Sequence, residues 1–336
     1  MAKQIRSTLD FLREIGWENC TRNKLPNDAS FRNYERLELN GETAILMDAT
    51  HPSEDIQPFS QIAYHLLKLG YSAPRILAED RKSGFMLLED LGPGTFSKIL
   101  RSRENEHFLY KLATDFLIEF HEHADVVIPK RIECYNEEIL LAEVNLFLDW
   151  YLPNILDNAL PEKSKTEYVS AWKKVLPYGL NVPKTLVLRD FHVDNLIYLP
   201  ERAGIGACGL LDFQDAVKGP ITYDLVSLLE DARRDISSEL VDEMLEHYVS
   251  SFNNFSRVDF FTSMAVLGAQ RHTKVIGIFT RLSQRDRKSN YLIHIPRVWQ
   301  MLENACMHPA LFPLKSWLDT NIPSHQRCVP KTGSIR

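Results

Sequence analysis

The fold is decided by two stretches of sequence, Leu186-Val-Leu-Arg-Asp190-Phe-His-Val-Asp-Asn195-Leu-Ile197 and Leu210-Leu-Asp212-Phe-Gln-Asp215. The first is typical of a strand end, a tight loop and a second strand, and the second of an apolar strand that ends in an acid. Phosphoryl transfer from ATP requires one carboxylate that orients a hydroxyl, and an amide and a second carboxylate that hold Mg²⁺. Asp190, Asn195 and Asp212 supply these groups in chain order, so the two stretches also predict a reaction class.

An ordinary structural explanation exists for the same residues. Asp and Asn are frequent in turns between strands, because their side chains hydrogen-bond to nearby backbone groups. Asp212, however, follows the apolar run Gly209-Leu-Leu, and a carboxylate at the end of a buried strand rarely lacks a partner. The carboxylate of Asp190 can orient the proton of an acceptor hydroxyl, and the oxygens of Asn195 and Asp212 are hard donors that suit Mg²⁺.

Length and composition fit a soluble globular chain with one large or two moderate domains, since 44% of its 336 residues are hydrophobic and 25% are charged. The net charge of −6 argues against nucleic acid as a partner. No signal peptide is recognised at Met1, and no apolar run approaches the roughly 20 residues of a membrane span. The five cysteines form no CxxC pair. We therefore expect a cytoplasmic monomer that contacts no membrane.

The first 90 residues read as a small sheet with two helices. Asn40-Gly41 is a hairpin turn signal, and Leu91-Gly-Pro-Gly94 interrupts all periodicity and marks a domain boundary. Strands are expected at 31–39, 43–49, 75–79 and 84–90, and helices at 5–15 and 56–69. After the boundary, helices are expected at 104–123, 137–151, 163–175 and from 222 onward, with a strand-rich segment from 185 to 213.

This pattern predicts an α+β fold of two lobes. Residues 1–90 form a small N-terminal nucleotide-binding lobe, and residues 91–336 form a large, mainly helical lobe for catalysis and substrate binding. A ligand is expected in the cleft between two such lobes.

With these motifs, the chain resembles the aminoglycoside phosphotransferase and choline kinase group, which is built like protein kinases. The resemblance covers nearly the whole chain and includes the segment from Pro220, where Asp224 opens a helix and can brace the loop. It implies that Asp190 is the catalytic aspartate and that Asn195 and Asp212 bind the metal. ATP and Mg²⁺ are then the expected cofactors, with adenine near the strand Met86 to Glu89.

Several segments look more specifically like the anomeric sugar kinases of bacterial cell-wall recycling. These kinases phosphorylate N-acetylmuramate and N-acetylglucosamine at C1. The matching segments are Ala29-Ser-Phe-Arg-Asn-Tyr, Leu88-Glu-Asp-Leu-Gly, Leu211-Asp-Phe-Gln-Asp-Ala and Gln270-Arg-His-Thr-Lys-Val-Ile-Gly-Ile-Phe-Thr-Arg-Leu. The last of them is the most specific to this subgroup.

Two positions depart from the group's pattern. Leu188 stands where the catalytic loop usually has a histidine, and the returning strand offers Met47 and Asp48 instead of the lysine that kinases use to hold the phosphates. Arg32 or Arg36, on the preceding strand, could supply that charge. Arg32, Arg36 and Glu89 are therefore the predicted cofactor-binding residues.

The acceptor site is predicted from two further regions. His192 and Asp194 lie inside the candidate catalytic loop, where they either contact substrate or only brace the loop. Arg271 interrupts an apolar helical stripe, and a buried cation there needs an anionic partner. Either an internal salt bridge or a pocket for a neutral or anionic acceptor explains Arg271 and Lys274. The local basicity weighs against a polycationic aminoglycoside, which needs an acidic pocket.

Two other motifs are explained more simply. Gly204-Ile-Gly-Ala-Cys-Gly209 fits GxGxxG, but a strand follows it at once, so a loop or hairpin is expected rather than a dinucleotide site. His121 and His123 are expected to be solvated surface, because residues two apart on a helix face different sides.

We therefore expect a sugar kinase in which Asp190 orients the C1 hydroxyl for in-line attack on ATP. One alternative is a kinase for another small hydroxyl compound, such as an aminoglycoside or an amino alcohol. Another is a nucleotide-binding pseudokinase without turnover, which the missing lysine and Leu188 motivate. A metal-dependent hydrolase that uses His192 and Asp194 is the most distant alternative.

Overall fold

The computed structural model describes residues 6–26, 30–102, 105–253 and 255–331. Ile5, Ala29 and Glu104, on which predictions fell, lie outside these ranges. The chain divides into two compact units, Met1–Phe116 with Val193–Ala216, and Leu117–His192 with Val217–Arg336. The borders of these two units differ from the predicted boundary after residue 90. The first unit also includes most of a long helix and the segment that carries Asn195 and Asp212. The assignment of nucleotide binding to 1–90 and of catalysis to 91–336 stays a proposal.

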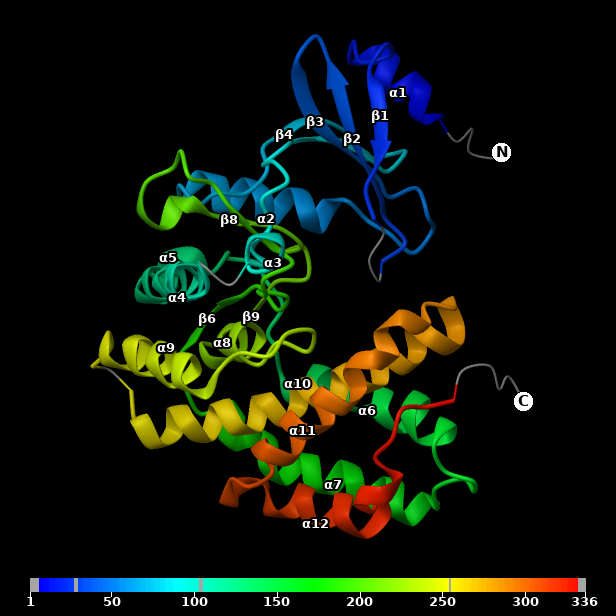
Figure 1. Ribbon diagram of the computed structural model, residues 1–336, viewed down its shortest axis with the longest axis vertical. Helices are drawn as coiled ribbons and strands as arrows, with labels where there is room; N and C mark the ends of the chain where they lie inside the picture. The colour runs from blue at the N-terminus through cyan, green and yellow to red at the C-terminus, as the bar shows by residue number, and fades with distance from the viewer. Residues whose placement is uncertain (1–5, 27–29, 103–104, 254, 332–336) are drawn as a thin grey trace. The chain divides into compact units, whose positions relative to one another are not determined.

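The first unit is built on an antiparallel sheet of five strands in the order β1-β2-β3-β5-β4 (Figure 1). The strands are β1 (Thr21–Lys24), β2 (Asn33–Leu39), β3 (Glu42–Asp48), β4 (Ile76–Asp80) and β5 (Phe85–Glu89). The predicted hairpin between β2 and β3 is confirmed, since Asn40 and Gly41 both have positive φ and Leu39 pairs with Glu42. Such a turn matches the twist of the strands that it joins.

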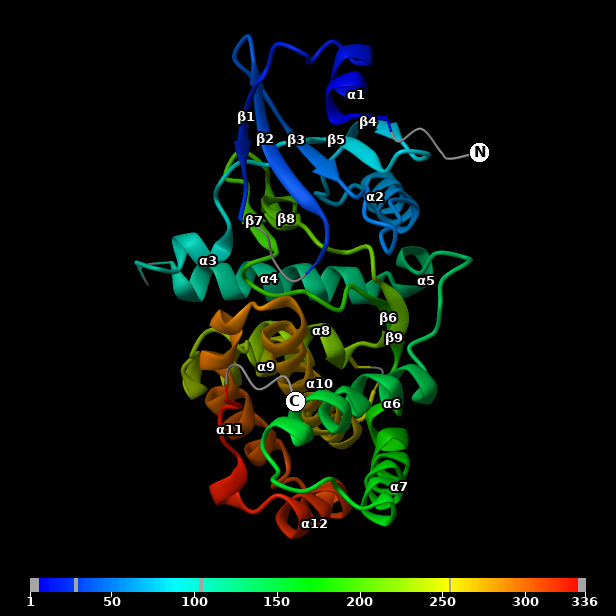
Figure 2. The same cartoon turned by 90° about the vertical axis from the view of Figure 1, so that its right-hand side faces the viewer.

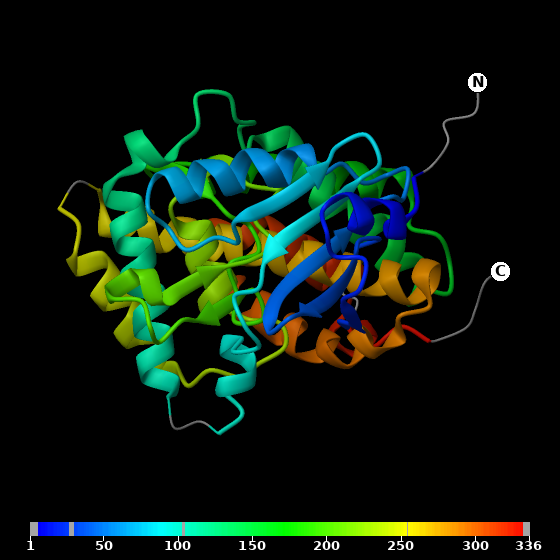
Figure 3. The ribbon, with the colours of Figure 1, turned by 90° about the horizontal axis from the view of Figure 1, so that it is seen from above.

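Helices cover this sheet at two places. Helix α1 (Thr8–Glu14) begins at a capping box of Ser7 and Asp10. Its residues Phe11 and Leu12 form a core cluster with five buried residues of the sheet, Leu37, Ala44, Leu46, Phe85 and Leu87. Helix α2 (Gln57–Lys68) runs beside β4 (Figure 3), where Ser60 donates a hydrogen bond of 2.7 Å to Glu79.

The rest of the first unit carries the end of the candidate catalytic loop. Strands β7 (Leu196–Tyr198) and β8 (Cys208–Leu210) pair with each other, and α3 (Phe96–Ile99) lies beside β7. A short 3₁₀ turn (Gly204–Ala207) connects the two strands, so the loop interpretation of GxGxxG is confirmed. Asp212 follows β8, and the ring of Phe213 stacks on Phe59 of α2 with centroids 4.9 Å apart.

The second unit is mainly helical and packs around α10 (Figures 1 and 2). Its helices are the end of α4 (Glu106–Glu122), α5 (Ala124–Val127), α6 (Glu137–Leu146), α7 (Glu162–Gly179), α8 (Thr222–Leu229), α9 (Ser238–Ser250), α10 (Arg257–Asp286), α11 (Ile295–Ala305) and α12 (Phe312–Asn321). A π-helical turn (Phe147–Tyr151) extends α6, and short 3₁₀ turns lie at 152–154, 289–294, 309–311 and 324–326. In the ranges that the structure describes, no helix has both the length and the apolarity to cross a membrane.

A two-stranded ladder leads into the candidate catalytic loop. Strand β6 (Lys184–Val187) pairs antiparallel with β9 (Val217–Pro220) (Figure 2), and the loop begins at Leu188. The predicted strand before Asp190 is therefore confirmed, whereas β1 and β9 were not predicted.

One predicted surface residue is buried. His121 is 5% exposed, and its Nδ1 lies 2.6 Å from the hydroxyl of Tyr248 on α9. The prediction of solvated surface was wrong for His121 and right for His123, which is exposed. The spacing of residues along α4 could not show that α9 packs against the side of α4 that carries His121. Burial lowers the pKa of His121 to about 3, so the imidazole is neutral at neutral pH.

Candidate functional site

Asp190 lies in the second unit, on a loop whose backbone is held by Asp224. The Asp224 carboxylate accepts hydrogen bonds from the N–H groups of Leu188 at 2.6 Å and Arg189 at 2.9 Å, as the bracing prediction requires. Burial raises the pKa of Asp224 to about 7, although these two hydrogen bonds oppose the rise. Arg189 has a φ of +70°, a left-handed conformation that a non-glycine residue keeps only where its surroundings fix it.

Asp190 is half-buried beside a group of cations. Nη2 of Arg271 lies 3.6 Å from its Oδ1, and Nη1 of Arg271 donates a 2.9 Å hydrogen bond to the carbonyl oxygen of Arg189. Burial raises the pKa of Asp190, but Arg271, followed by Lys274, outweighs it and lowers the pKa to about 2. Asp190 is therefore ionised at neutral pH and can accept a hydrogen bond from a hydroxyl.

Glu143 of α6 is the buried carboxylate of this region. Its Oε1 accepts a 2.8 Å hydrogen bond from Lys274 and pairs with the guanidinium of Arg189. Its Oε2 accepts hydrogen bonds from Tyr135 at 2.6 Å and Gln270 at 2.8 Å. Both oxygens are thus used by donors from three other parts of the second unit. Burial raises the pKa of Glu143, but Lys274 and Arg189 outweigh this and lower it below its usual range.

The two other loop residues with predicted roles fall in different units. His192 is buried in the second unit, and its backbone N–H donates to the carbonyl oxygen of Asp190 at 3.1 Å. Burial, with a smaller contribution from Arg233, lowers the pKa of His192. Asp194 is half-buried in the first unit. A direct contact of either residue with substrate stays a prediction.

Asn195 and Asp212 lie together in the first unit. Nδ2 of Asn195 is 3.4 Å from Oδ2 of Asp212, and Gln214 donates a 2.8 Å hydrogen bond to Oδ1 of Asp212. Asp212 has a φ of +55°, a second left-handed residue at the candidate site. One amide and one carboxylate are a donor set that fits Mg²⁺, which usually takes one or two protein oxygens, waters and substrate phosphates. Among the described residues, no three His, Cys, Asp or Glu side chains group as metal ligands.

Arg32 also lies in the first unit, within the electrostatic reach of Asp212. Only 8% of the residue is exposed, and its Nε is 2.8 Å from Oε2 of Glu54. Burial lowers the pKa of Arg32, but Tyr34, Glu54 and Asp212 raise it overall, so it remains a cation. Tyr34 pairs directly with Met47 in the β2–β3 register. Arg32 itself lies just before β2 rather than on the strand, where it was predicted to lie, and it is two residues from Tyr34.

The other two predicted cofactor residues are engaged in ion pairs within the same unit. Arg36 donates two hydrogen bonds to Asp90, at 2.7 and 2.9 Å. Glu89 accepts hydrogen bonds from Arg75 at 3.1 Å and from Arg202 at 3.2 Å. Arg36 therefore fixes the end of β5 to β2, whereas Arg32 interacts electrostatically with the predicted metal ligand Asp212.

The structure thus brings the predicted residues together in two groups. Asp190, His192, Arg271 and Lys274 belong to the second unit, and Arg32, Arg36, Glu89, Asp194, Asn195 and Asp212 belong to the first. Sequence reasoning missed Glu143 and Glu54. Glu143 lies 46 and 131 residues from Arg189 and Lys274, so no local pattern could connect them.

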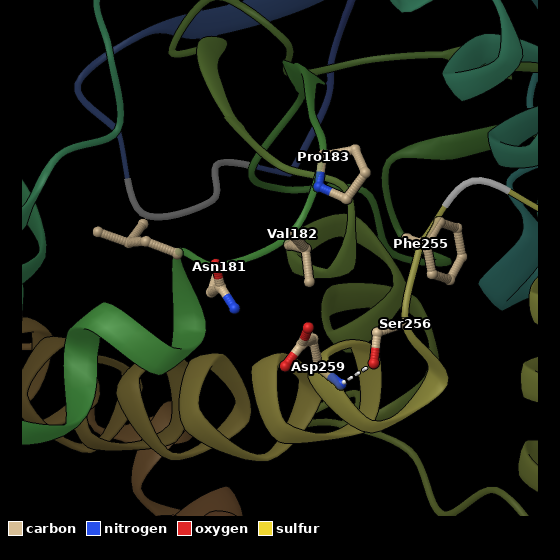
Figure 4. A pocket seen from close by; sticks show the side chains of 7 residues that line it. Asn181, Val182, Pro183, Phe255, Ser256 and Asp259 are labelled. Atoms are coloured by element: carbon tan, nitrogen blue, oxygen red, sulfur yellow. Dashed lines mark hydrogen bonds between the residues drawn. The ribbon is translucent and has the colours of Figure 1, made fainter.

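A separate hollow of about 260 Å³ lies in the second unit, between the end of α7 and the start of α10 (Figure 4). It is lined by Leu180, Asn181, Val182, Pro183, Phe255, Ser256 and Asp259. None of the predicted site residues takes part in it. Ser256 there caps α10 by accepting the N–H of Asp259, which explains its presence without a ligand.

Comparisons with known proteins match most of the chain. Residues 21–261 match the sequence model of the Phosphotransferase enzyme family. The N-acetylmuramate/N-acetylglucosamine kinase of Caulobacter vibrioides is 32% identical, over 94% of this chain and 96% of that protein. The protein of the same name from Pseudomonas aeruginosa is 36% identical, over 83% of this chain and 82% of that protein.

Solved structures share the fold at low sequence identity. Choline kinase LicA from Streptococcus pneumoniae aligns with a TM-score of 0.63 and 14% identity, over 89% of this chain and 98% of that one. LicA in complex with AMP aligns with a TM-score of 0.60 and 13% identity, over 88% and 96% of the two chains. The predicted α+β, protein-kinase-like fold and the resemblance to the choline kinase group are therefore confirmed.

Proposed function

Because this chain belongs to the Phosphotransferase enzyme family, we propose that it is an ATP-dependent kinase for the anomeric C1 hydroxyl of N-acetylmuramate and N-acetylglucosamine, in cell-wall recycling. The names of the relatives from Caulobacter vibrioides and Pseudomonas aeruginosa support these two sugars. The observation that carries the proposal is the ionised Asp190 on a braced loop within a chain that aligns with such kinases almost end to end.

Asp190 orients the attacking hydroxyl. Its pKa of about 2 makes it a weak base, so it is poorly suited to remove a proton from an ordinary alcohol. An anomeric hydroxyl is more acidic than an ordinary alcohol, so a weak base is sufficient to orient it and accept its proton. Most of the catalysis is then positioning and charge stabilisation, as in other phosphoryl transfers.

Asn195 and Asp212 would hold Mg²⁺. When bound, the ion neutralises negative charge on the phosphates of ATP. Gln214 has a supporting role here, because its hydrogen bond to Oδ1 fixes the carboxylate of Asp212.

Arg32 is the better candidate for contact with the phosphates of ATP. It is a buried cation that is paired with Glu54 and lies in the electrostatic field of Asp212. Asp90 accepts hydrogen bonds from Nε and Nη2 of Arg36, so the role proposed for Arg36 is to hold the strand rather than the phosphates. Glu89, at the end of β5, is proposed to lie beside the adenine.

Acceptor recognition is assigned to the residues near Asp190. His192, Asp194, Arg271 and Lys274 remain the proposed acceptor-binding residues. Lys274 and Arg271 make internal ion pairs, which favours the salt-bridge explanation for part of their charge. Arg189, Arg271 and Lys274 lie among the carboxyl groups of Glu143, Asp190 and Asp224. Three cations beside the proposed acceptor position suit a neutral or anionic sugar better than a polycationic aminoglycoside.

The proposal is tested by ADP release from ATP and Mg²⁺ with a panel of acceptors. We expect turnover with N-acetylmuramate and N-acetylglucosamine and little with choline or an aminoglycoside. A preference for choline or an aminoglycoside would contradict the sugar assignment. Absence of turnover with every acceptor would favour the pseudokinase alternative.

A further inference from the structure

Glu143 is a buried carboxylate to which neither the family motifs nor the sequence pattern assigns a role. It is 8% exposed and lies on α6, remote in sequence from the catalytic loop. Four side chains donate to it, from Tyr135, Arg189, Gln270 and Lys274. A buried ion pair is costly to form, because both charges lose water, and well-packed apolar residues are often as stable. Packing alone therefore does not account for this arrangement.

The contacts of Glu143 lead directly to the residue that precedes Asp190. Arg189 points its guanidinium at Glu143 and at the ring of Tyr135, 5.3 Å from the ring centroid. The carbonyl oxygen of the same residue accepts a hydrogen bond from Arg271, and its N–H donates to Asp224. Arg189 is thereby fixed at its side chain and at both sides of its backbone, in a left-handed conformation. Its position sets the direction of the next residue, Asp190.

Glu143 also controls which cations are available to Asp190. Lys274 donates hydrogen bonds to Glu143 at 2.8 Å and to the hydroxyl of Tyr223 at 3.4 Å. Both Lys274 and Arg189 act electrostatically on Asp190. Without a carboxylate at position 143, these two buried cations would be left with Asp190 as a remaining partner. A carboxylate engaged by further cations is less able to accept the hydrogen bond of an acceptor hydroxyl.

We propose that Glu143 is a positioning residue for phosphoryl transfer, which anchors Arg189 and keeps Lys274 and Arg189 away from Asp190. It acts through Arg189 and Lys274 and does not contact the substrate itself. This inference rests on the proposed function only for the role of Asp190.

The first test is Glu143→Gln, which keeps the size and removes the charge. We expect kcat to fall by about 10- to 100-fold, the range of a lost charge-assisted hydrogen bond, while the KM for ATP changes less than about twofold. Tyr135→Phe is the matched control, because it removes one hydrogen bond to Glu143 and leaves the charge; we expect kcat within about threefold of wild type. A circular dichroism melt of each variant measures the folded fraction.

A double variant separates positioning from general stability. In Glu143→Gln with Lys274→Met, one of the two uncompensated cations is gone. Measured with both single variants as a double-mutant cycle, kcat should be higher than the product of the single effects predicts. Additive losses, or a kcat of Glu143→Gln equal to that of wild type, would overturn the inference.

Hydrogen exchange tests the same inference without any activity. The amides of Leu188 and Arg189 are hydrogen-bonded to Asp224 in the full chain. In Glu143→Gln, we expect the peptide that covers residues 188–192 to exchange faster while β6 is unchanged. Unchanged exchange in that peptide contradicts the positioning role, whatever the acceptor is. Failure of the sugar assignment would instead appear in wild type, as missing turnover with both N-acetyl sugars.

Discussion

The two units hold the side chains of the candidate site in different ways. In the second unit, a network of buried charges surrounds Asp190, and Glu143 alone receives four donors. In the first unit, the charged residues form separate pairs, Arg32 with Glu54 and Arg36 with Asp90, on a sheet with a small core cluster. The proposed catalytic residue is thus set in a crowded environment, whereas each of the two arginines of the first unit pairs with one carboxylate.

This difference predicts different consequences of mutation. Changes in the buried network should affect kcat, because several groups move together and reach Asp190. Changes in the separate pairs should affect the KM for ATP, and each pair should respond independently of the other.

The largest effect is expected at the centre of the network. Asp190→Asn keeps the shape and removes the charge that orients the hydroxyl, so kcat should fall by about 10²- to 10⁴-fold. ADP release with saturating sugar and ATP measures it. Near-native turnover of this variant would contradict the proposed difference between the two units, because the network would then surround a residue without a catalytic role.

A smaller effect is expected in the first unit, and there the KM for ATP should change rather than kcat. Arg32→Met removes a charge-assisted contact of about 1.5–3 kcal/mol, which corresponds to a rise of about 10- to 100-fold in the KM for ATP. Arg36→Met is the control, since Asp90 already binds that guanidinium. Equal KM values for ATP in both variants would show that the two pairs do not differ in function.

The pH dependence sharpens the account of Arg271. Arg271 lowers the pKa of Asp190, and the lowered value keeps the carboxylate ionised as the pH falls. In Arg271→Met that pKa should rise, because the cation that lowers it most is gone, so the acidic limb of the kcat/KM profile should move to higher pH. Profiles of both proteins between pH 4 and 8 test this. Superimposable acidic limbs with a higher KM for the sugar would instead indicate direct contact with the acceptor.

The smallest effect on activity is expected at His121, far from the candidate site in the sequence, where a substitution should instead change the pH dependence of stability. Its folded pKa of about 3 lies below the usual value of 6.5, so the unfolded chain binds more protons and stability is lost as the pH falls below 6.5. Wild type should lose about 2 kcal/mol between pH 7.5 and 5 through this residue, and His121→Gln should lack that loss. Urea unfolding at both pH values measures it, and equal losses in the two proteins would contradict the burial of a neutral imidazole.

Much of the fold could be predicted because its signals are local. The Asn40-Gly41 turn between β2 and β3 and the glycine after α2 each act within a few residues. The strand before Asp190 and the helix that Asp224 opens were also predicted, because an apolar run and an acidic first turn are visible in sequence.

The remainder depended on contacts between distant residues. The burial of His121 needs Tyr248, 127 residues away, and the role of Glu143 needs Lys274 on another helix. Strand β1 is fully exposed and carries no apolar alternation, so its pairing with β2 left no signal. Arg32 was predicted for its charge, but Glu54 was not predicted as its partner.

The identity of the phosphorylated oxygen tests the central claim most directly. Phosphorus NMR of the product from N-acetylmuramate, ATP and Mg²⁺, with Asp190→Asn as a parallel sample, distinguishes an anomeric phosphate from other sugar phosphates. The account predicts a C1 phosphate that forms with wild type and is nearly absent with the variant. A phosphate on another oxygen, or equal product from both proteins, would contradict it.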